Sequence, residues 1–204
     1  KAQYDLLRTR AEEKREELCD MDANMGDGDL GLTMDKGYGA LPGLLRENME
    51  AGDAGKTLMK AGMKMSSVVP STMGTLMSSG IMEGGKALKG RAEIGPADLA
   101  AYLTAFAGGI QKRGKCQQGD RTILDAVAPA AEAAEKAAAE GGDLAAVLAA
   151  ACEGAAQGVE ATKGMTAKFG KAAVFAAKAA GVADQGAVAG MYMLRGLKRG
   201  LEAL

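Results

Sequence analysis

Apolar residues recur at helical spacing along most of the chain. In the first segment, Tyr4, Leu7, Ala11 and Leu18 are separated by charged neighbours. This pattern is typical of an amphipathic helix that buries one stripe and exposes the other to solvent. The segment therefore predicts a helix that leads directly into residues 20–31.

Helix start and stop residues place the remaining elements. Gly95-Pro96 with Asp98 behind it is a start signal, because proline fits the first turn and an acid favours the positive end of the dipole. Asp143 and Asp184 are similarly placed to cap helices. The predicted helices cover 32–48 (disturbed at Pro42), 53–65, a piece ending near residue 88 after a polar stretch at 66–75, 119–140, 143–163 and a short Ala-rich piece after a loop at 164–171. The helix that begins at Pro96 has its apolar stripe at Leu99, Leu103, Phe106 and Ile110, and the last helix, capped by Asp184, has its buried line at Ala187, Met191, Leu194 and Leu201.

No segment alternates convincingly between apolar and polar residues, so strands are not predicted. We expect an all-α fold of about eight antiparallel helices, joined mostly by short connections and packed as a bundle or helical barrel with a nucleotide site at one end. At 204 residues the chain is long enough to bury a core without disulfides or zinc, and one domain over 1–204 is the working expectation.

Composition supports helices and narrows the chemistry. Hydrophobic residues make up 48% of the chain but aromatic residues only 3%, so the core must be built from Ala, Leu, Met and Val. The 25 basic and 26 acidic side chains are spread evenly, which does not favour nucleic acid or an anionic membrane as a partner. Because histidine is absent, the sequence excludes histidine triads, histidine-ligated metals and a phosphohistidine on this chain.

The cysteines and the apolar segments indicate the cellular compartment of the protein. Cys19, Cys116 and Cys152 are odd in number, far apart and without CxxC spacing, which indicates a reducing, cytoplasmic setting. The sequence shows no apolar run of about 18 residues and no basic segment leading into an apolar one near its start, so neither a membrane-spanning helix nor a signal peptide is expected.

The segment 20–31 carries the most informative chemistry. Asp22, Asp27 and Asp29 lie within eight residues, and three glycines let the backbone turn their carboxylates toward one point. Carboxylates held this close repel one another unless a cation compensates, and hard oxygen ligands suit Mg²⁺ or Ca²⁺. The spacing does not fit an EF-hand, so calcium sensing is disfavoured. The next helix begins near Gly31, and its unpaired amides can receive phosphate oxygens.

At these residues the chain resembles the dihydroxyacetone kinase L subunit family (the DhaL or DAK2 type), whose motif is an Asp followed by GDGD or GDAD, a variable residue, a Gly and a helix. The resemblance extends over nearly the whole chain, and three further matches follow in order. They are 62–76, similar to a glycine-rich nucleotide loop; 113–129, with Gly119-Asp120-Arg121-Thr122; and 163–187, similar to a basic loop followed by an Asp-Pro-Gly-Ala turn.

The resemblance implies roles for particular residues. Asp22, Asp27 and Asp29 would coordinate Mg²⁺ on the phosphates of ADP or ATP and serve as the catalytic centre, and Lys171 would supply a positive charge. The other residues that would contact the nucleotide are Leu30, Gly31, Leu32, Thr33, Thr72, Met73, Gly114, Ile123, Asp184, Gln185 and Gly186.

The chain departs from the family pattern at four of these positions. Leu30 stands where His, Thr or Cys is common, and Met73 stands where a serine would donate a hydrogen bond. Gln185 replaces the usual proline, and Lys171 replaces an arginine and so gives up a bidentate fork.

The resemblance implies a phosphotransferase subunit that passes a phosphoryl group to dihydroxyacetone or a similar short ketose on a separate K-type subunit. The donor would be ATP or an M-type phosphotransferase-system protein, and the chain could form a homodimer. Two alternatives stay open at this point: a non-catalytic, nucleotide-binding regulatory module, and a kinase for another small sugar such as a tetrulose.

Overall fold

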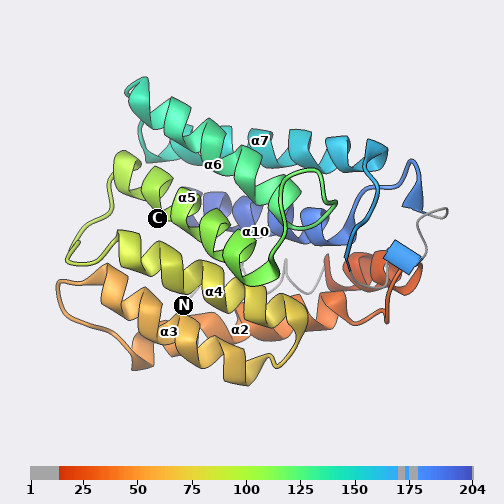
Figure 1. Ribbon diagram of the computed structural model, residues 1–204. Helices are drawn as coiled ribbons and strands as arrows, with labels where there is room; N and C mark the ends of the chain where they lie inside the picture. Colours follow the sequence, from red (N-terminus) through yellow and green to blue (C-terminus); the bar gives the residue numbers. More distant parts are fainter. Residues whose placement is uncertain (1–13, 170–172, 175–178, 204) are drawn as a thin grey trace.

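The computed structural model describes residues 14–169, 173–174 and 179–203, and all regular structure in these ranges is helical (Figure 1). Residues 14–23 form a helix that runs into the acidic loop. The other helices are α2 (Leu30–Glu47), α3 (Ala54–Val68), α4 (Thr72–Ala87), α5 (Pro96–Gly114), α6 (Leu124–Ala139), α7 (Leu144–Ala161), the short η1 (Thr162–Gly164) and α10 (Gln185–Glu202). The all-α prediction is confirmed.

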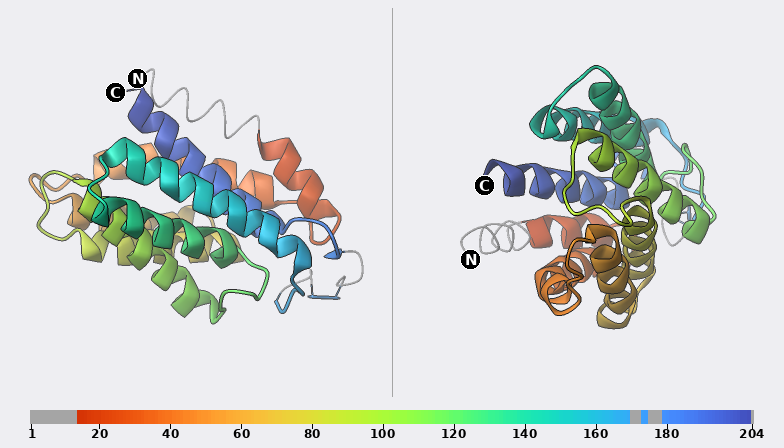
Figure 2. Two further views of the ribbon diagram at one scale, coloured as in Figure 1. Left: turned by 90° about the horizontal axis from the view of Figure 1, so that it is seen from above. Right: turned by 90° about the vertical axis from the view of Figure 1, so that its left-hand side faces the viewer.

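The helices form a ring in sequence order. Each of α2 to α6 packs against the next helix along the chain, α7 packs on α10, and α10 returns to touch α2. In the right-hand view of Figure 2 the colours accordingly follow the ring from orange through green to blue. Because successive helices run in opposite directions, α2, α4, α6 and α10 all begin at the same end of the ring.

Small residues let the helices approach closely. Gly158 of α7 lies directly against the backbone of α6, where an added Cβ would overlap the carbonyl oxygen of Asp125. On α4, Gly80 and Gly84 lie beneath the rings of Phe106 and Tyr102, which pack 6.0 Å apart between centroids. Around these contacts the fully buried side chains are mainly aliphatic, as the composition predicts: Met65, Met77, Ile110, Ile123, Leu124, Val147 and Leu194.

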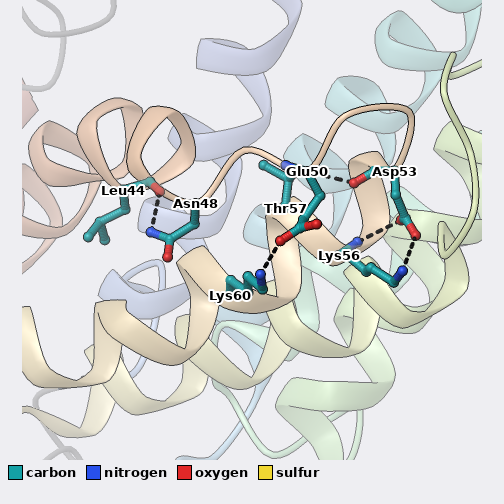
Figure 3. A network of polar contacts seen from close by, with 7 residues as sticks. All are labelled: Leu44, Asn48, Glu50, Asp53, Lys56, Thr57 and Lys60. Atoms are coloured by element: carbon teal, nitrogen blue, oxygen red, sulfur yellow. Dashed lines mark hydrogen bonds and ion pairs between the residues drawn. The ribbon is translucent and has the colours of Figure 1, made fainter.

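The connection between α2 and α3 is held by polar contacts (Figure 3). Asp53 caps α3 by accepting from the Lys56 amide at 2.8 Å. The Thr57 hydroxyl accepts from the Glu50 amide at 2.9 Å and donates to the Asp53 carbonyl at 3.0 Å, while Glu50 also pairs with Lys60. These contacts satisfy the amides of the turn and fix the angle between the two helices.

One described helix, 144–164, is long and apolar enough to meet the length and composition criteria for a membrane span. Its apolar residues Val147, Ala151 and Ala155 are buried in the same core as α6 and α10. The helix is therefore accounted for as a core helix of this ring.

The structure corrects three details of the predicted elements. The polar stretch 66–75 is mostly helical, because α3 continues to Val68 and α4 begins at Thr72 behind the Ser71 cap. The helix expected from residue 119 begins only at Leu124, after a turn in which Gly119 and Arg121 have positive φ. Pro42 lies inside α2 without ending it.

Candidate functional site

A cavity of about 1280 Å³ opens at the end of the ring where α2, α4, α6 and α10 begin. Helix N-termini carry unpaired amides and a partial positive charge, so four of them around one cavity favour an anionic ligand. The exposed guanidinium of Arg113, near the end of α5, adds a formal positive charge to the cavity wall. Acidic side chains from the loop before α2 face the same space.

Asp22 organises the acidic loop. Its Oδ2 accepts hydrogen bonds from the amides of Gly28, Asp29 and Leu30 at 3.0, 3.1 and 3.3 Å, and its side chain is buried. Gly28 has a φ of +78°, a conformation that glycine adopts without strain and that the turn requires. The loop is thus wrapped around the Asp22 carboxylate.

Asp27 and Asp29 complete a three-carboxylate cluster. One carboxylate oxygen from each of Asp22, Asp27 and Asp29 lies within 4.8 Å of the others, and the last two side chains are exposed. Asp29 precedes α2 without capping it through its side chain, so its carboxylate is not occupied by the helix.

The cluster fits a hard divalent cation. Oxygens around an octahedral Mg²⁺ lie about 3–4 Å apart, so small side-chain rotations bring one oxygen of each acid into its shell. Three carboxylates at this separation also repel one another, and a cation relieves that repulsion. The all-oxygen donor set, with the Gln185 Oε1 buried nearby and without a hydrogen-bond partner, suits Mg²⁺ rather than zinc or copper.

Most of the residues predicted for nucleotide contact line this cavity. Besides the three acids, they are Leu30, Thr33, Thr72, Met73, Gly114, Ile123, Asp184, Gln185 and Gly186. Gly31 and Leu32 are not among the lining residues: Gly31 packs against the helix 14–23, where a Cβ would overlap the Arg15 carbonyl oxygen, and Leu32 is 56% exposed elsewhere. Lys171 lies outside the described residues.

Arg121 is a lining residue that the sequence did not single out. Its guanidinium is buried, and it donates to the carbonyl oxygens of Thr162, Ala179 and Val182 at 3.3, 3.2 and 2.9 Å. It also lies against the sulfur of Met25 beside the acidic loop. Arg121 therefore ties three distant segments to the cavity wall, an arrangement that sequence spacing alone does not reveal.

The turn before α6 depends on two buried acids. Asp125 accepts from the amides of Gly119 and Thr122 at 2.5 and 2.7 Å, and it is fully buried. Asp120 accepts from the Gln117 amide at 2.8 Å and pairs with Lys168, which holds the pKa of its carboxyl below the usual range. Both acids therefore have structural roles in this turn.

Asp184 caps α10 at the cavity wall. Its carboxylate accepts from the Ala187 amide at 2.9 Å, as predicted for this residue, and its own amide donates to the Thr162 hydroxyl at 2.9 Å. Burial raises the pKa of Asp184 to about 6, although the Ala187 amide and the nearby Arg121 partly offset that effect. The ionised form of this acid is therefore disfavoured by the fold.

This raised pKa predicts the stability of an Asp184→Asn variant. The ordinary carboxyl pKa is near 4, so between about pH 4 and 6 the unfolded chain releases a proton that the folded chain keeps. The free energy of unfolding of the wild type therefore falls as the pH rises through this window. The asparagine keeps an acceptor for the cap and should be more stable by roughly 1–3 kcal/mol at pH 7. Urea unfolding of both proteins at pH 4, 5, 6 and 7 measures the difference, which should vanish toward pH 4; a constant difference would contradict it.

Comparison with known proteins shows which class has this architecture. The family described as DAK2 domain matches residues 24–199. The ADP-binding subunit DhaL of the PEP-dependent dihydroxyacetone kinase of Escherichia coli is 28% identical over 180 residues, covering 88% of this chain and 85% of that subunit. The structure of the C. freundii dihydroxyacetone kinase in complex with AMP-PNP and Mg²⁺ superimposes with a TM-score of 0.72 at 25% identity, covering 97% of this chain and 33% of that one.

The helical ring thus has the fold of part of a dihydroxyacetone kinase. The chain belongs to the DAK2 domain family. Other relatives are longer than the shared region: a DhaL subunit from Listeria innocua is 31% identical, with 56% of its length covered, and the triokinase/FMN cyclase of Rattus norvegicus is 30% identical, with 31% covered. The chain therefore spans only about half or a third of these relatives.

Proposed function

We propose that this chain is an L-type subunit of a dihydroxyacetone kinase, which binds Mg–ADP or Mg–ATP and takes part in phosphoryl transfer to dihydroxyacetone or a similar short ketose. The observation that carries the proposal is the convergence of Asp22, Asp27 and Asp29 at a cavity surrounded by four helix N-termini. The AMP-PNP and Mg²⁺ bound to the C. freundii enzyme, and the description of the E. coli relative as an ADP-binding subunit, support it.

In this proposal the three acids hold Mg²⁺, and the phosphates lie over the beginnings of α2 and α4. Thr33 and Thr72 offer hydroxyls there, while Gly114, Ile123 and Met73 form the wall for the ribose and adenine. The turn 184–186 forms a further part of the cavity wall. Gly31 and Leu32 do not line the cavity, so they would contact the phosphates only through their main-chain amides. Lys171 keeps its proposed role, but it lies outside the described residues.

The chemistry suits a chain without histidine. Phosphoryl transfer depends on positioning and on neutralising charge rather than on a covalent protein group. Bound Mg²⁺ would neutralise the phosphate oxygens, and the cavity residues would hold the nucleotide in line with its acceptor. The helix N-termini and Arg113 would add positive potential around the phosphates.

The acceptor would be held by a separate K-type subunit, as the resemblance to the dihydroxyacetone kinase L subunits implies. Reconstitution tests the proposal: the chain, a K-type subunit and either ATP or an M-type phosphotransferase-system donor are mixed with dihydroxyacetone. We expect dihydroxyacetone phosphate to form only when all parts are present. Tight Mg–ADP binding without transfer from either donor would instead favour a regulatory nucleotide-binding module, a reading that the apolar Leu30 at the cavity wall also allows.

A further inference from the structure

Gln185 is the first residue of α10, and its side chain faces the acidic loop. Its Nε2 donates to the Oδ1 of Asp22 at 3.4 Å, joining residues 163 positions apart. The cap of α10 is already provided by Asp184, so this side chain is not needed to begin the helix. The contact therefore concerns the loop rather than the helix.

The contact is made to the oxygen of Asp22 that remains open for a cation. Oδ2 already accepts from three backbone amides, which leaves Oδ1 as the oxygen with coordination capacity. Gly26 bounds Oδ1 on the other side, because a Cβ at that position would overlap it. Gly26 and the Gln185 amide therefore together fix the orientation of Oδ1 of Asp22.

The other end of the same amide lacks a partner. The Oε1 of Gln185 is buried and accepts no hydrogen bond from any described residue, although Gln185 lines the cavity. A buried acceptor normally has a donor. Mg²⁺ keeps several of its waters when it binds to a few carboxylates, and each of those waters is a hydrogen-bond donor.

We propose that Gln185 is a positioning residue of the cation site. Its amide N–H orients the Oδ1 of Asp22, and its Oε1 accepts a hydrogen bond from a water on the bound cation. This inference rests on the proposed function, since it requires a divalent cation at the three acids. Residues that orient metal ligands in this way commonly change metal affinity by 10–100-fold.

The test uses Gln185→Pro, which removes the amide at a position suited to proline. The first helical position has no intrahelical acceptor for its N–H, and the preceding residue Asp184, with φ −68° and ψ 128°, already has a conformation allowed before proline. Binding of Mn²⁺ in the presence of ADP, followed by electron paramagnetic resonance, should weaken about tenfold. The unfolding temperature measured without metal should stay the same.

Gln185→Leu serves as a second variant in case proline disturbs the helix. The matched control is Gln157→Leu on α7, where the glutamine side chain donates to Glu153 at 3.2 Å. Loss of Mn²⁺ affinity in both Gln185 variants but not in the control supports the inference. Wild-type Mn²⁺ affinity in the Gln185 variants, or an equal loss of Mn²⁺ affinity in the control, would overturn this inference alone. Failure of the wild type to bind Mn²⁺ would overturn the proposed function as well.

Discussion

Replacing Asp27 by asparagine is expected to weaken the binding of Mg–ADP by about 100-fold or more, equivalent to roughly 2.7 kcal/mol. The side chain is exposed at the cavity and belongs to the three-carboxylate cluster. An amide keeps its size but removes one of the negative charges that compensate the cation, and Mg²⁺ selects for such charged oxygens. Isothermal titration of Mg–ADP into both proteins measures the change.

The matched control for this variant is Asp20→Asn. Asp20 is an exposed acid on the helix that leads into the same loop, but it does not line the cavity. Its replacement removes the same charge a short distance away, so a general electrostatic effect would appear in both variants. Nearly equal affinities of the Asp27 variant and the wild type would remove this acid from the cation site.

Gly158→Ala is expected to destabilise the fold by roughly 2–3 kcal/mol, although alanine is the better helix former by about 1 kcal/mol. The added methyl group would overlap the carbonyl oxygen of Asp125 and push α7 away from α6. That displacement would reach the cavity, because Asp125 fixes the turn that carries Arg121 and Thr122. Chemical denaturation followed by circular dichroism measures the loss.

Gly108→Ala on α5 provides the contrast for this second variant. An added Cβ there meets nothing within 4 Å, so only helix propensity acts and the free energy of unfolding should rise by about 0.5–1 kcal/mol. The same Gly→Ala substitution should thus lower the free energy of unfolding at Gly158 and raise it at Gly108. Stabilisation by both alanines would show that α6 and α7 are not in such close contact.

The helices and the acidic loop were predictable from the sequence because both depend on neighbouring residues. Caps such as Asp143 and Asp184 act over three positions, and Asp22, Asp27 and Asp29 lie on one short glycine-containing turn. Helix propensity and glycine turns act over the same short range. These local signals were sufficient for the fold class and for the grouping of the three acids.

Residues that act across the ring were harder to predict. Asp125 looks like a surface charge on a helix, yet it is buried because it holds the amides of a turn in which Arg121 has a φ of 60°. Arg121 and Gln185 gain their partners only when segments more than 40 positions away fold beside them. The exposure of Leu32 follows from the helical period. Leu32 is two positions before Met34, so it lies on the face of α2 opposite Met34 and the core.

Diffraction from crystals grown with ADP and Mn²⁺ would show whether the three acids hold a cation beside the nucleotide, because the anomalous signal locates the cation without reference to activity. We expect one Mn²⁺ peak bound by carboxylate oxygens of Asp22, Asp27 and Asp29, with the phosphates of ADP beside it in the cavity. A nucleotide bound elsewhere, or a Mn²⁺ peak away from these three acids, would contradict it.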